Sequence, residues 1–141
     1  MNTDFARSRA ALLATIALAL GAESAMAKDV KLSLTGTEET PPVTTSASAT
    51  GTLKVAKDKS VSGVIKTSGI DGTAAHIHVG APGQNGPPII TLTKGADGTW
   101  TVPPGSKLTD EQYASFKGGN LYVNVHSAEH KPGEIRAQLK P

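Results

Sequence analysis

The chain has 141 residues, enough for one domain with a buried core, and its formal net charge is only +2. So weak a charge gives no reason to expect nucleic acid or an anionic membrane as a partner. The chain has no cysteine, which excludes disulfides, iron–sulfur clusters, thiolate zinc sites and a lipoprotein anchor, so a metal site here would need nitrogen and oxygen ligands.

The first 27 residues have the layout of a secretory signal peptide. Arg7 and Arg9 precede an apolar run, Ala10 to Leu20, and the sequence AMA that ends at Ala27 has the small-x-small form of a cleavage site. The run is shorter than the roughly 20 residues that a membrane span needs. We therefore expect residues 28–141 to be a mature protein in the periplasm or outside the cell, without a membrane association after cleavage. An uncleaved anchor is the alternative.

The mature part has the pattern of β-structure, because Thr and Val recur in short runs between Gly and Pro turn signals. Residues 38–50, rich in Pro, Ser and Thr, are interpreted as an ordered crossing segment, since strands resume on both sides of them. In chain order, strands are expected near 30–36, 51–56, 61–67, 74–80, 88–94, 98–103, 120–127 and 133–139.

One short helix is expected within residues 108–119. Thr109 is suited to cap it, Asp110 and Glu111 would lie in its first turn, and Gly118 and Gly119 would end it. Seven or eight short strands with turns between them, plus this helix, predict an all-β domain over residues 28–141. The expected architecture is an antiparallel Greek-key sandwich or barrel.

Three of the expected strands divide their side chains between two faces in the same way. The apolar sets, expected in the core, are Ala75, Ile77 and Val79; Leu121, Val123 and Val125; and Ile135, Ala137 and Leu139. The opposite, outer face then collects His76, His78, His126, Glu134 and Arg136. Alternation does not establish which strands are neighbours, except for the last two, which have the pattern of a hairpin.

The three histidines are candidate metal ligands. His76 and His78 stand at i and i+2, with Cα atoms about 6–7 Å apart, so their rings can converge on one ion at about 2.0–2.1 Å per bond. His126 from a neighbouring strand would complete a three-nitrogen site with an open position, which suits copper first and zinc second. The alternative is an exposed histidine pair without a metal, but the chain has only four histidines, which favours a site.

Two further residues have open roles. His130 follows in the last loop and is either a fourth metal ligand or a solvated loop residue. Arg136 is a candidate for guiding an anionic substrate toward the metal, and its alternative is a surface ion pair with Glu134 or Glu129.

Three blocks of the sequence also form a known pattern. They are Glu39 with Pro41–Val43; His76, His78 and Gly80 with Asn85–Pro87; and Asn124 and His126 with Gly133–Arg136. In this order they resemble the CHRD domain, known from chordin and from secreted bacterial proteins. The resemblance implies an immunoglobulin-like or related β-sandwich, and it makes His76, His78 and His126 motif positions. His130 matches no motif residue, and Ala137 stands where the family often has Gly.

A looser resemblance is to copper–zinc superoxide dismutase. That family also places an H-x-H pair on the outer face of an antiparallel barrel, with a later histidine and an arginine near the copper, matching His76, His78, His126 and Arg136. This chain lacks the disulfide and an obvious zinc loop with its histidine cluster. The resemblance implies a superoxide dismutase-like barrel and a copper-only site.

The sequence therefore predicts an exported CHRD-domain protein that binds one copper ion and either handles the metal or disproportionates superoxide. The rival interpretation is a metal-free adhesion or interaction module, whose histidine face contacts a protein partner. A zinc hydrolase with Glu39 or Glu134 as its base ranks last, because nothing in the sequence defines a substrate pocket.

Overall fold

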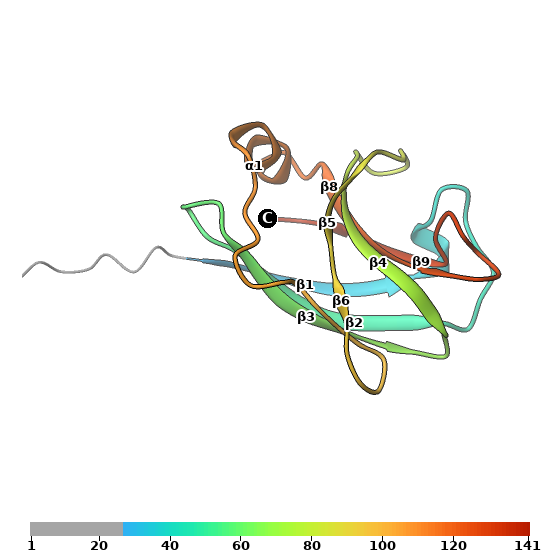
Figure 1. Ribbon diagram of the computed structural model, residues 1–141. Coiled ribbons are helices and arrows are strands. Elements are labelled where there is room, and N and C mark those ends of the chain that lie inside the picture. Colours follow the sequence, from blue (N-terminus) through green and yellow to red (C-terminus); the bar gives the residue numbers. More distant parts are fainter. Residues whose placement is uncertain (1–26) are drawn as a thin grey trace, which may run out of the picture.

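Figure 1 shows the fold in a computed structural model, which describes residues 27–141. The signal peptide expected at residues 1–27 lies outside the described residues, apart from its last residue. The strands are β1 (Lys28–Thr35), β2 (Ser48–Val55), β3 (Val61–Ser68), β4 (Gly72–Val79), β5 (Pro88–Thr91), β6 (Thr93–Lys94), β7 (Thr99–Thr101), β8 (Leu121–Ser127) and β9 (Ile135–Leu139). The short 3-10 helix η1 (Gly36–Glu38) follows β1, and α1 (Asp110–Lys117) precedes β8.

The nine strands form one antiparallel sheet in the order β5-β4-β8-β9-β1-β2-β3-β7-β6. The strands at the two ends of this sheet, β5 and β6, are separated in the chain by Leu92 alone, so the two ends lie close together. The backbone N–H of Leu92 donates to the carbonyl of Ala75 in β4 at 2.9 Å, which continues the pairing of β5 with β4. The sheet is thus nearly closed into a barrel (Figure 1). The predicted all-β antiparallel fold with one helix is confirmed, although the strand expected at 88–94 is divided at Leu92 into β5 and β6.

The inside of the barrel holds the apolar sets that strand alternation predicted. The side chains of Ala75, Ile77, Leu121, Val123, Val125, Ile135, Ala137 and Leu139 are buried, and Val79 is half-buried. They pack with the alternating residues of β1, Val30, Leu32 and Leu34. Each large side chain buried in this way contributes about 1.5–3 kcal/mol, so the core holds β4, β8 and β9 in a fixed register.

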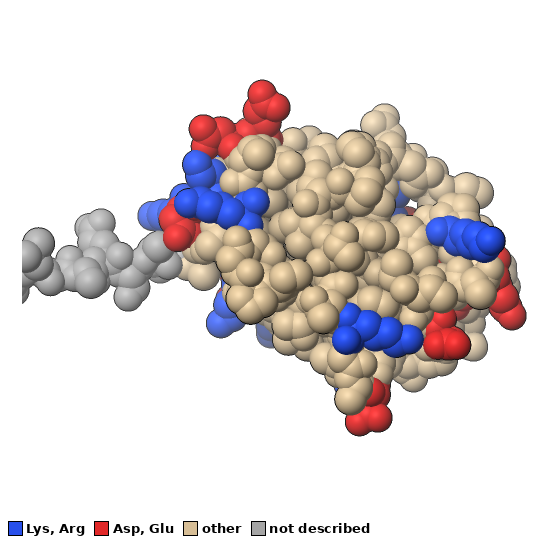
Figure 2. Space-filling model, viewed as in Figure 1, with Lys and Arg blue, Asp and Glu red and all other residues tan. Residues whose placement is uncertain are grey.

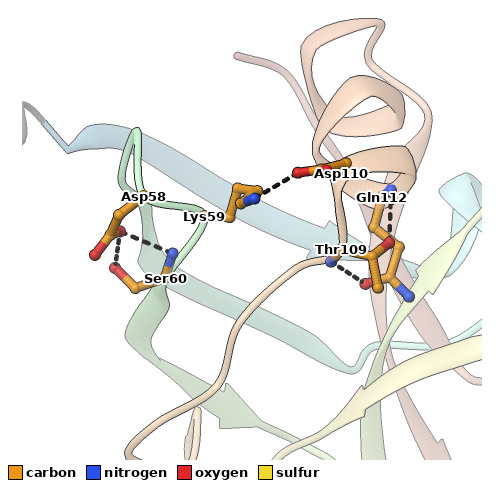
Figure 3. A network of polar contacts seen from close by, with 6 residues as sticks. All are labelled: Asp58, Lys59, Ser60, Thr109, Asp110 and Gln112. Atoms are coloured by element: carbon orange, nitrogen blue, oxygen red, sulfur yellow. Dashed lines mark hydrogen bonds and ion pairs between the residues drawn. The ribbon is translucent and has the colours of Figure 1, made fainter.

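The helix begins and ends as the sequence predicted. The side chain of Thr109 accepts the backbone N–H of Gln112, and the side chain of Gln112 accepts the N–H of Thr109, which together make a capping box (Figure 3). Gly119 adopts a φ of +76°, a left-handed conformation that favours glycine. No helix in the described part of the chain has the length and hydropathy to cross a membrane.

A second contact in Figure 3 joins this helix to the barrel. The ammonium of Lys59, in the turn between β2 and β3, donates to the carboxylate of Asp110 in the first helical turn. In the turn between β2 and β3, the carboxylate of Asp58 also accepts the hydroxyl and the backbone N–H of Ser60. The helix is therefore held at one end of the barrel. On the face shown in Figure 2, charged side chains stand mainly at the margins, and neutral residues cover the centre.

Three loops cover the outer face of β4, β8 and β9, and they comprise residues 36–47, 80–87 and 128–134. The amide of Asn85 donates to the carbonyl of Thr40 at 2.7 Å, and the hydroxyl of Thr45 donates to Glu134 at 2.9 Å. The first and last of these loops lie together at the end of the barrel drawn at the right of Figure 1. The outer face of these strands is therefore not an open surface: His78, Asn124 and Arg136 are buried, and His76 and His126 are half-buried.

Candidate metal centre

The three motif histidines converge on one face of two adjacent strands. In the antiparallel register of β4 and β8, His76 lies opposite Asn124, and Ala74 lies opposite His126. Side chains two residues apart on a strand share a face, so His78 joins His76 beside His126. The ring centroids are 5.5 Å apart for His76 and His78, 4.9 Å for His76 and His126, and 6.0 Å for His78 and His126.

The spacing of their nitrogens suits a single ion. One ligand nitrogen from each histidine lies within 4.8 Å of the other two. The closest pair, Nδ1 of His76 and Nε2 of His126, is 3.0 Å apart. Two nitrogens bound to one ion at about 2.0–2.1 Å, with an angle of about 90–100° between the bonds, are separated by about 3 Å. This pair therefore needs almost no movement to hold a metal.

Two backbone carbonyls determine which ring nitrogen of His78 and of His126 has a lone pair available for a metal. Nδ1 of His126 lies 2.7 Å from the carbonyl oxygen of Lys131, and Nδ1 of His78 lies 2.9 Å from that of Gly86. A carbonyl only accepts, so each Nδ1 carries the proton and each Nε2 keeps its lone pair. Metal-binding histidines in proteins are oriented by this type of bond.

His78 has an unpartnered nitrogen that points to a ligand. Its side chain is only 7% exposed, and its Nε2 has no hydrogen-bond partner among the described residues. A buried acceptor without a partner costs about 1–3 kcal/mol. A metal ion bound to this lone pair would remove that cost, so the residues present fit a bound metal.

The surroundings of His76 and His78 favour the neutral form of both rings. Burial lowers the pKa of His76, and the neighbouring His126 and His78 lower it further. Burial likewise lowers the pKa of His78, while the Gly86 carbonyl opposes this and His126 adds to it. Only neutral imidazole binds a metal, so these shifts keep His76 and His78 able to bind a metal at moderately acidic pH.

Tyr122 supports the pair of His78 and Gly86. Its ring stacks on that of His78, with centroids 4.7 Å apart and planes 4° apart, and its hydroxyl accepts the N–H of Gly86 at 3.1 Å. Gly86 passes so close to β4 that a Cβ atom there would meet the Val79 carbonyl oxygen at 1.7 Å. Only glycine fits, which explains why the loop of residues 80–87 holds its carbonyl against His78.

Arg136 lies in the same buried layer and is not a surface residue. Its side chain is 1% exposed, and its guanidinium carbon lies 3.5 Å from the ring centre of Tyr122. It donates to Asn85 Oδ1, to the Ala81 carbonyl and to Gln138, each at 3.2 Å. Among the described residues it forms no ion pair, so the alternative of a surface pair with Glu134 or Glu129 is wrong.

Two further buried residues, Asn124 and Glu39, lie beside Arg136, although strand alternation predicted no role for Asn124 and Glu39 was expected only as a motif residue and an alternative base. Glu39 is 5% exposed and its Oε1 has no partner in the described chain, and Asn124 is 2% exposed with an equally unpartnered Oδ1. Burial raises the pKa of Glu39, and Arg136 and Asn124 oppose the rise. A Cβ at Gly133, whose φ is +134°, would lie 2.4 Å from Glu39 Oε1 and 2.6 Å from Asn124 Nδ2. The motif glycine thus makes room for both.

His130 and Glu134 lie in a different group from the three histidines. Glu134 precedes β9, and its carboxylate accepts the hydroxyls of Thr45 and Ser127. A ligand atom of His130 lies within 4.8 Å of those of Glu129 and Glu134. The structure thus brings together His76, His78 and His126, and it places Arg136 on the same face of the sheet, two strands from His76: Asn124 is paired with His76 on one side and with Arg136 on the other.

The three sequence blocks that resemble one family meet in this network. Glu39 and Thr40 come from the first block, Asn85 and Gly86 from the second, and Gly133 and Arg136 from the third, and the contacts described above join them. A comparison with family models matches residues 30–139 to the CHRD domain. Searches of curated proteins and of solved structures find no match. The looser resemblance to copper–zinc superoxide dismutase is thus not supported by any comparison.

Proposed function

The chain belongs to the CHRD domain family, and from the geometry of its histidines we propose that it binds one copper ion through His76, His78 and His126. The observation that carries the proposal is the buried lone pair on His78 Nε2, which no group of the described chain uses. It lies beside the imidazoles of His76 and His126. The carbonyl of Lys131 orients the ring of His126, and the carbonyl of Gly86 orients the ring of His78.

Copper is preferred to zinc because all three ligands are imidazoles. Imidazole binds both ions, but the affinity of nitrogen sites for divalent metals is highest for copper. Three protein ligands leave a coordination position open, and bound copper would supply one-electron redox chemistry there. The protein's own part is to hold the rings in one tautomer and to exclude other ligands from the buried side.

The direct test is metal analysis of the protein purified without an affinity tag from its native compartment. We expect about one copper per chain and a Cu(II) electron paramagnetic resonance spectrum with nitrogen couplings from imidazole. A protein that arrives without metal and binds no added copper would favour the rival function, a metal-free interaction module.

Superoxide disproportionation is a second candidate, favoured by one observation of charge. Arg136 lies on the same face of the sheet as the three histidines, and among the described residues no carboxylate pairs with it within 4 Å, so its positive charge acts close to the site. Such a field would attract a small anion. Pulse radiolysis of the copper-loaded protein should show disproportionation that slows with added salt, because salt screens charges over about 8–10 Å. A rate no higher than that of copper bound to a histidine peptide would contradict the candidate.

We also infer that the protein is exported, from the composition of residues 1–27. N-terminal sequencing of the protein from whole cells tests this. Export with cleavage predicts a chain that begins at Lys28, and a chain that retains Arg7 and Arg9 would contradict cleavage and favour the uncleaved anchor.

A further inference from the structure

The loop between β8 and β9 carries a second group of ligand-bearing side chains, which the copper proposal does not use. One ligand atom each of Glu129, His130 and Glu134 lies within 4.8 Å of the other two. Glu129 is exposed, His130 is half-buried and Glu134 is buried. We propose that these three residues form a second metal site, for a divalent cation of the zinc type.

Glu134 is the residue that points to a cation. Its side chain is 6% exposed, and its two carboxylate oxygens accept hydroxyls, from Thr45 at 2.9 Å and from Ser127 at 2.8 Å. Within residues 27–141, no Lys, Arg or His nitrogen pairs with it within 4 Å. Hydroxyls orient a carboxylate but do not neutralise it, and a buried charge without a counter-charge is costly. A bound dication would supply the counter-charge.

The surroundings have room for the ion and its water. A polar hollow of about 460 Å³ borders the group, lined also by Thr45, Asp71 and Ser127. Ligands of one zinc ion lie about 3.3 Å apart in a tetrahedral site, and the ligand atoms of this group lie within 4.8 Å of one another, so the group must close by about 1.5 Å at most. The exposed Glu129 side chain and the half-buried His130 ring are placed to do so by rotation, while the two hydroxyls hold Glu134.

The backbone of the loop is already folded around this group. The carbonyl of His130 accepts the N–H groups of Ser127 at 3.3 Å and Gly133 at 3.0 Å, and the N–H of His130 donates to the Ser127 hydroxyl at 3.1 Å. These bonds fix the loop from both ends, so binding requires ordering of side chains rather than of the chain. One imidazole and two carboxylates are ligands that zinc accepts, whereas the copper site has imidazoles alone.

The test uses the mature protein with His76→Ala and His78→Ala, which removes two copper ligands and keeps the contact of His126 with the loop. Zinc titration by calorimetry should show one bound ion, and zinc-edge X-ray absorption should show one imidazole among oxygen ligands. Adding Glu129→Gln or His130→Ala should weaken zinc binding at least tenfold. Adding Glu111→Gln, an exposed carboxylate in the first turn of α1, is the matched control and should change nothing.

The proposal is overturned if the double variant binds no zinc, or if zinc binding survives both loop substitutions unchanged. Circular dichroism of each variant separates loss of a ligand from loss of the fold. These results are independent of the copper proposal, because His130→Ala in the otherwise unchanged protein should remove the second site and leave copper binding intact. Loss of copper alone would leave the zinc site standing.

Discussion

Nδ1 of His76 lies 3.0 Å from Nε2 of His126, although the two residues are 50 positions apart in the chain. Because the Lys131 carbonyl holds the proton of His126 on Nδ1, the contact in the metal-free protein is a hydrogen bond donated by His76. A copper ion would replace the proton between them. When His76 binds through Nδ1, its ring proton should therefore move from Nδ1 to Nε2, so that metal binding changes the tautomer of His76 without net release of a proton.

The first prediction concerns the ligands. His76→Ala, His78→Ala and His126→Ala should each lower copper affinity by about 100-fold or more, since loss of an outer hydrogen-bond partner alone costs about 10–100-fold. Competition titration with a copper chelator measures this. His130→Ala is the control and should keep nearly full affinity, because its ring belongs to the other group. Equal effects of all four substitutions would refute the three-histidine site.

The second prediction concerns pH. The ordinary pKa of histidine is 6.5, and burial lowers the pKa of both His76 and His78. Protons compete with the metal for His76 and His78 only below these lowered values, so copper should remain bound to these two residues as the pH falls through 6.5 and should leave at a lower pH. Spectroscopic titration of the Cu(II) protein measures the midpoint. A midpoint at or above 6.5 would contradict the lowered values, and a spectrum unchanged to about pH 4 would indicate carboxylate ligands.

Without metal, the same shifts link stability to pH. A group whose pKa is lower in the folded state binds fewer protons there than in the unfolded chain. The contribution of these two histidines to the free energy of unfolding should therefore be fully present above pH 6.5 and should decrease as the pH falls below it, toward the lowered pKa of His76 and His78. Urea unfolding of the metal-free protein measures this. The variant His76→Gln should show a smaller decrease, and an equal decrease would contradict the assignment.

The third prediction concerns Gly133. Gly133→Ala should lower the free energy of unfolding by about 2–4 kcal/mol, because it adds left-handed backbone strain to a collision with the buried carboxylate of Glu39. Gly105→Ala is the matched control, since Gly105 also has a positive φ, of +80°, but has nothing within 4 Å of its Cβ position. It should cost only about 1 kcal/mol. Equal losses of free energy of unfolding in the two variants would show that the collision with Glu39 does not contribute to the effect of Gly133→Ala.

The fourth prediction concerns Glu39. Burial raises its pKa above the ordinary value of 4.5, against the influence of Arg136. The folded state then holds this proton more strongly than the unfolded chain, so its contribution to stability is present below pH 4.5 and is lost as the pH rises through the raised pKa. Relative to the wild type, Glu39→Gln should gain stability between pH 4 and 8. A constant difference over this range, measured by urea unfolding, would contradict the raised pKa.

Strand alternation was sufficient to predict the barrel core and the shared face of the three histidines. The period of two places Ile77 inside and His76 and His78 outside whatever the neighbouring strands are. That β4 pairs with β8 was not predictable, because β4 and β8 are separated by four other elements. The helix was predictable in detail, since its cap and its stop are local signals at Thr109 and Gly119.

The burial of the outer face could not be predicted from strand periodicity. It depends on contacts between distant loops, such as that of Asn85 with the carbonyl of Thr40, 45 residues away. For the same reason Arg136 was expected at the surface, and Asn124 was given no role. One local signal was available in the sequence. Loops rich in Gly and Pro, such as those containing Asn85–Pro87 and Pro132–Gly133, follow strands with polar residues on one face. Such polar residues are candidates for burial under the loops.

The near closure of the sheet limits how other chains can attach to this protein. Its two edge strands are short: β5 has four residues and begins at Pro88, which lacks an N–H, and β6 has two. The remaining part of the β4 edge is occupied by the N–H of Leu92 on Ala75 and the ammonium of Lys94 on the carbonyl of Gly72. Little backbone is left for a foreign strand to extend, so the domain should resist edge-to-edge aggregation. A protein partner would therefore bind through side chains rather than by adding a strand to the sheet.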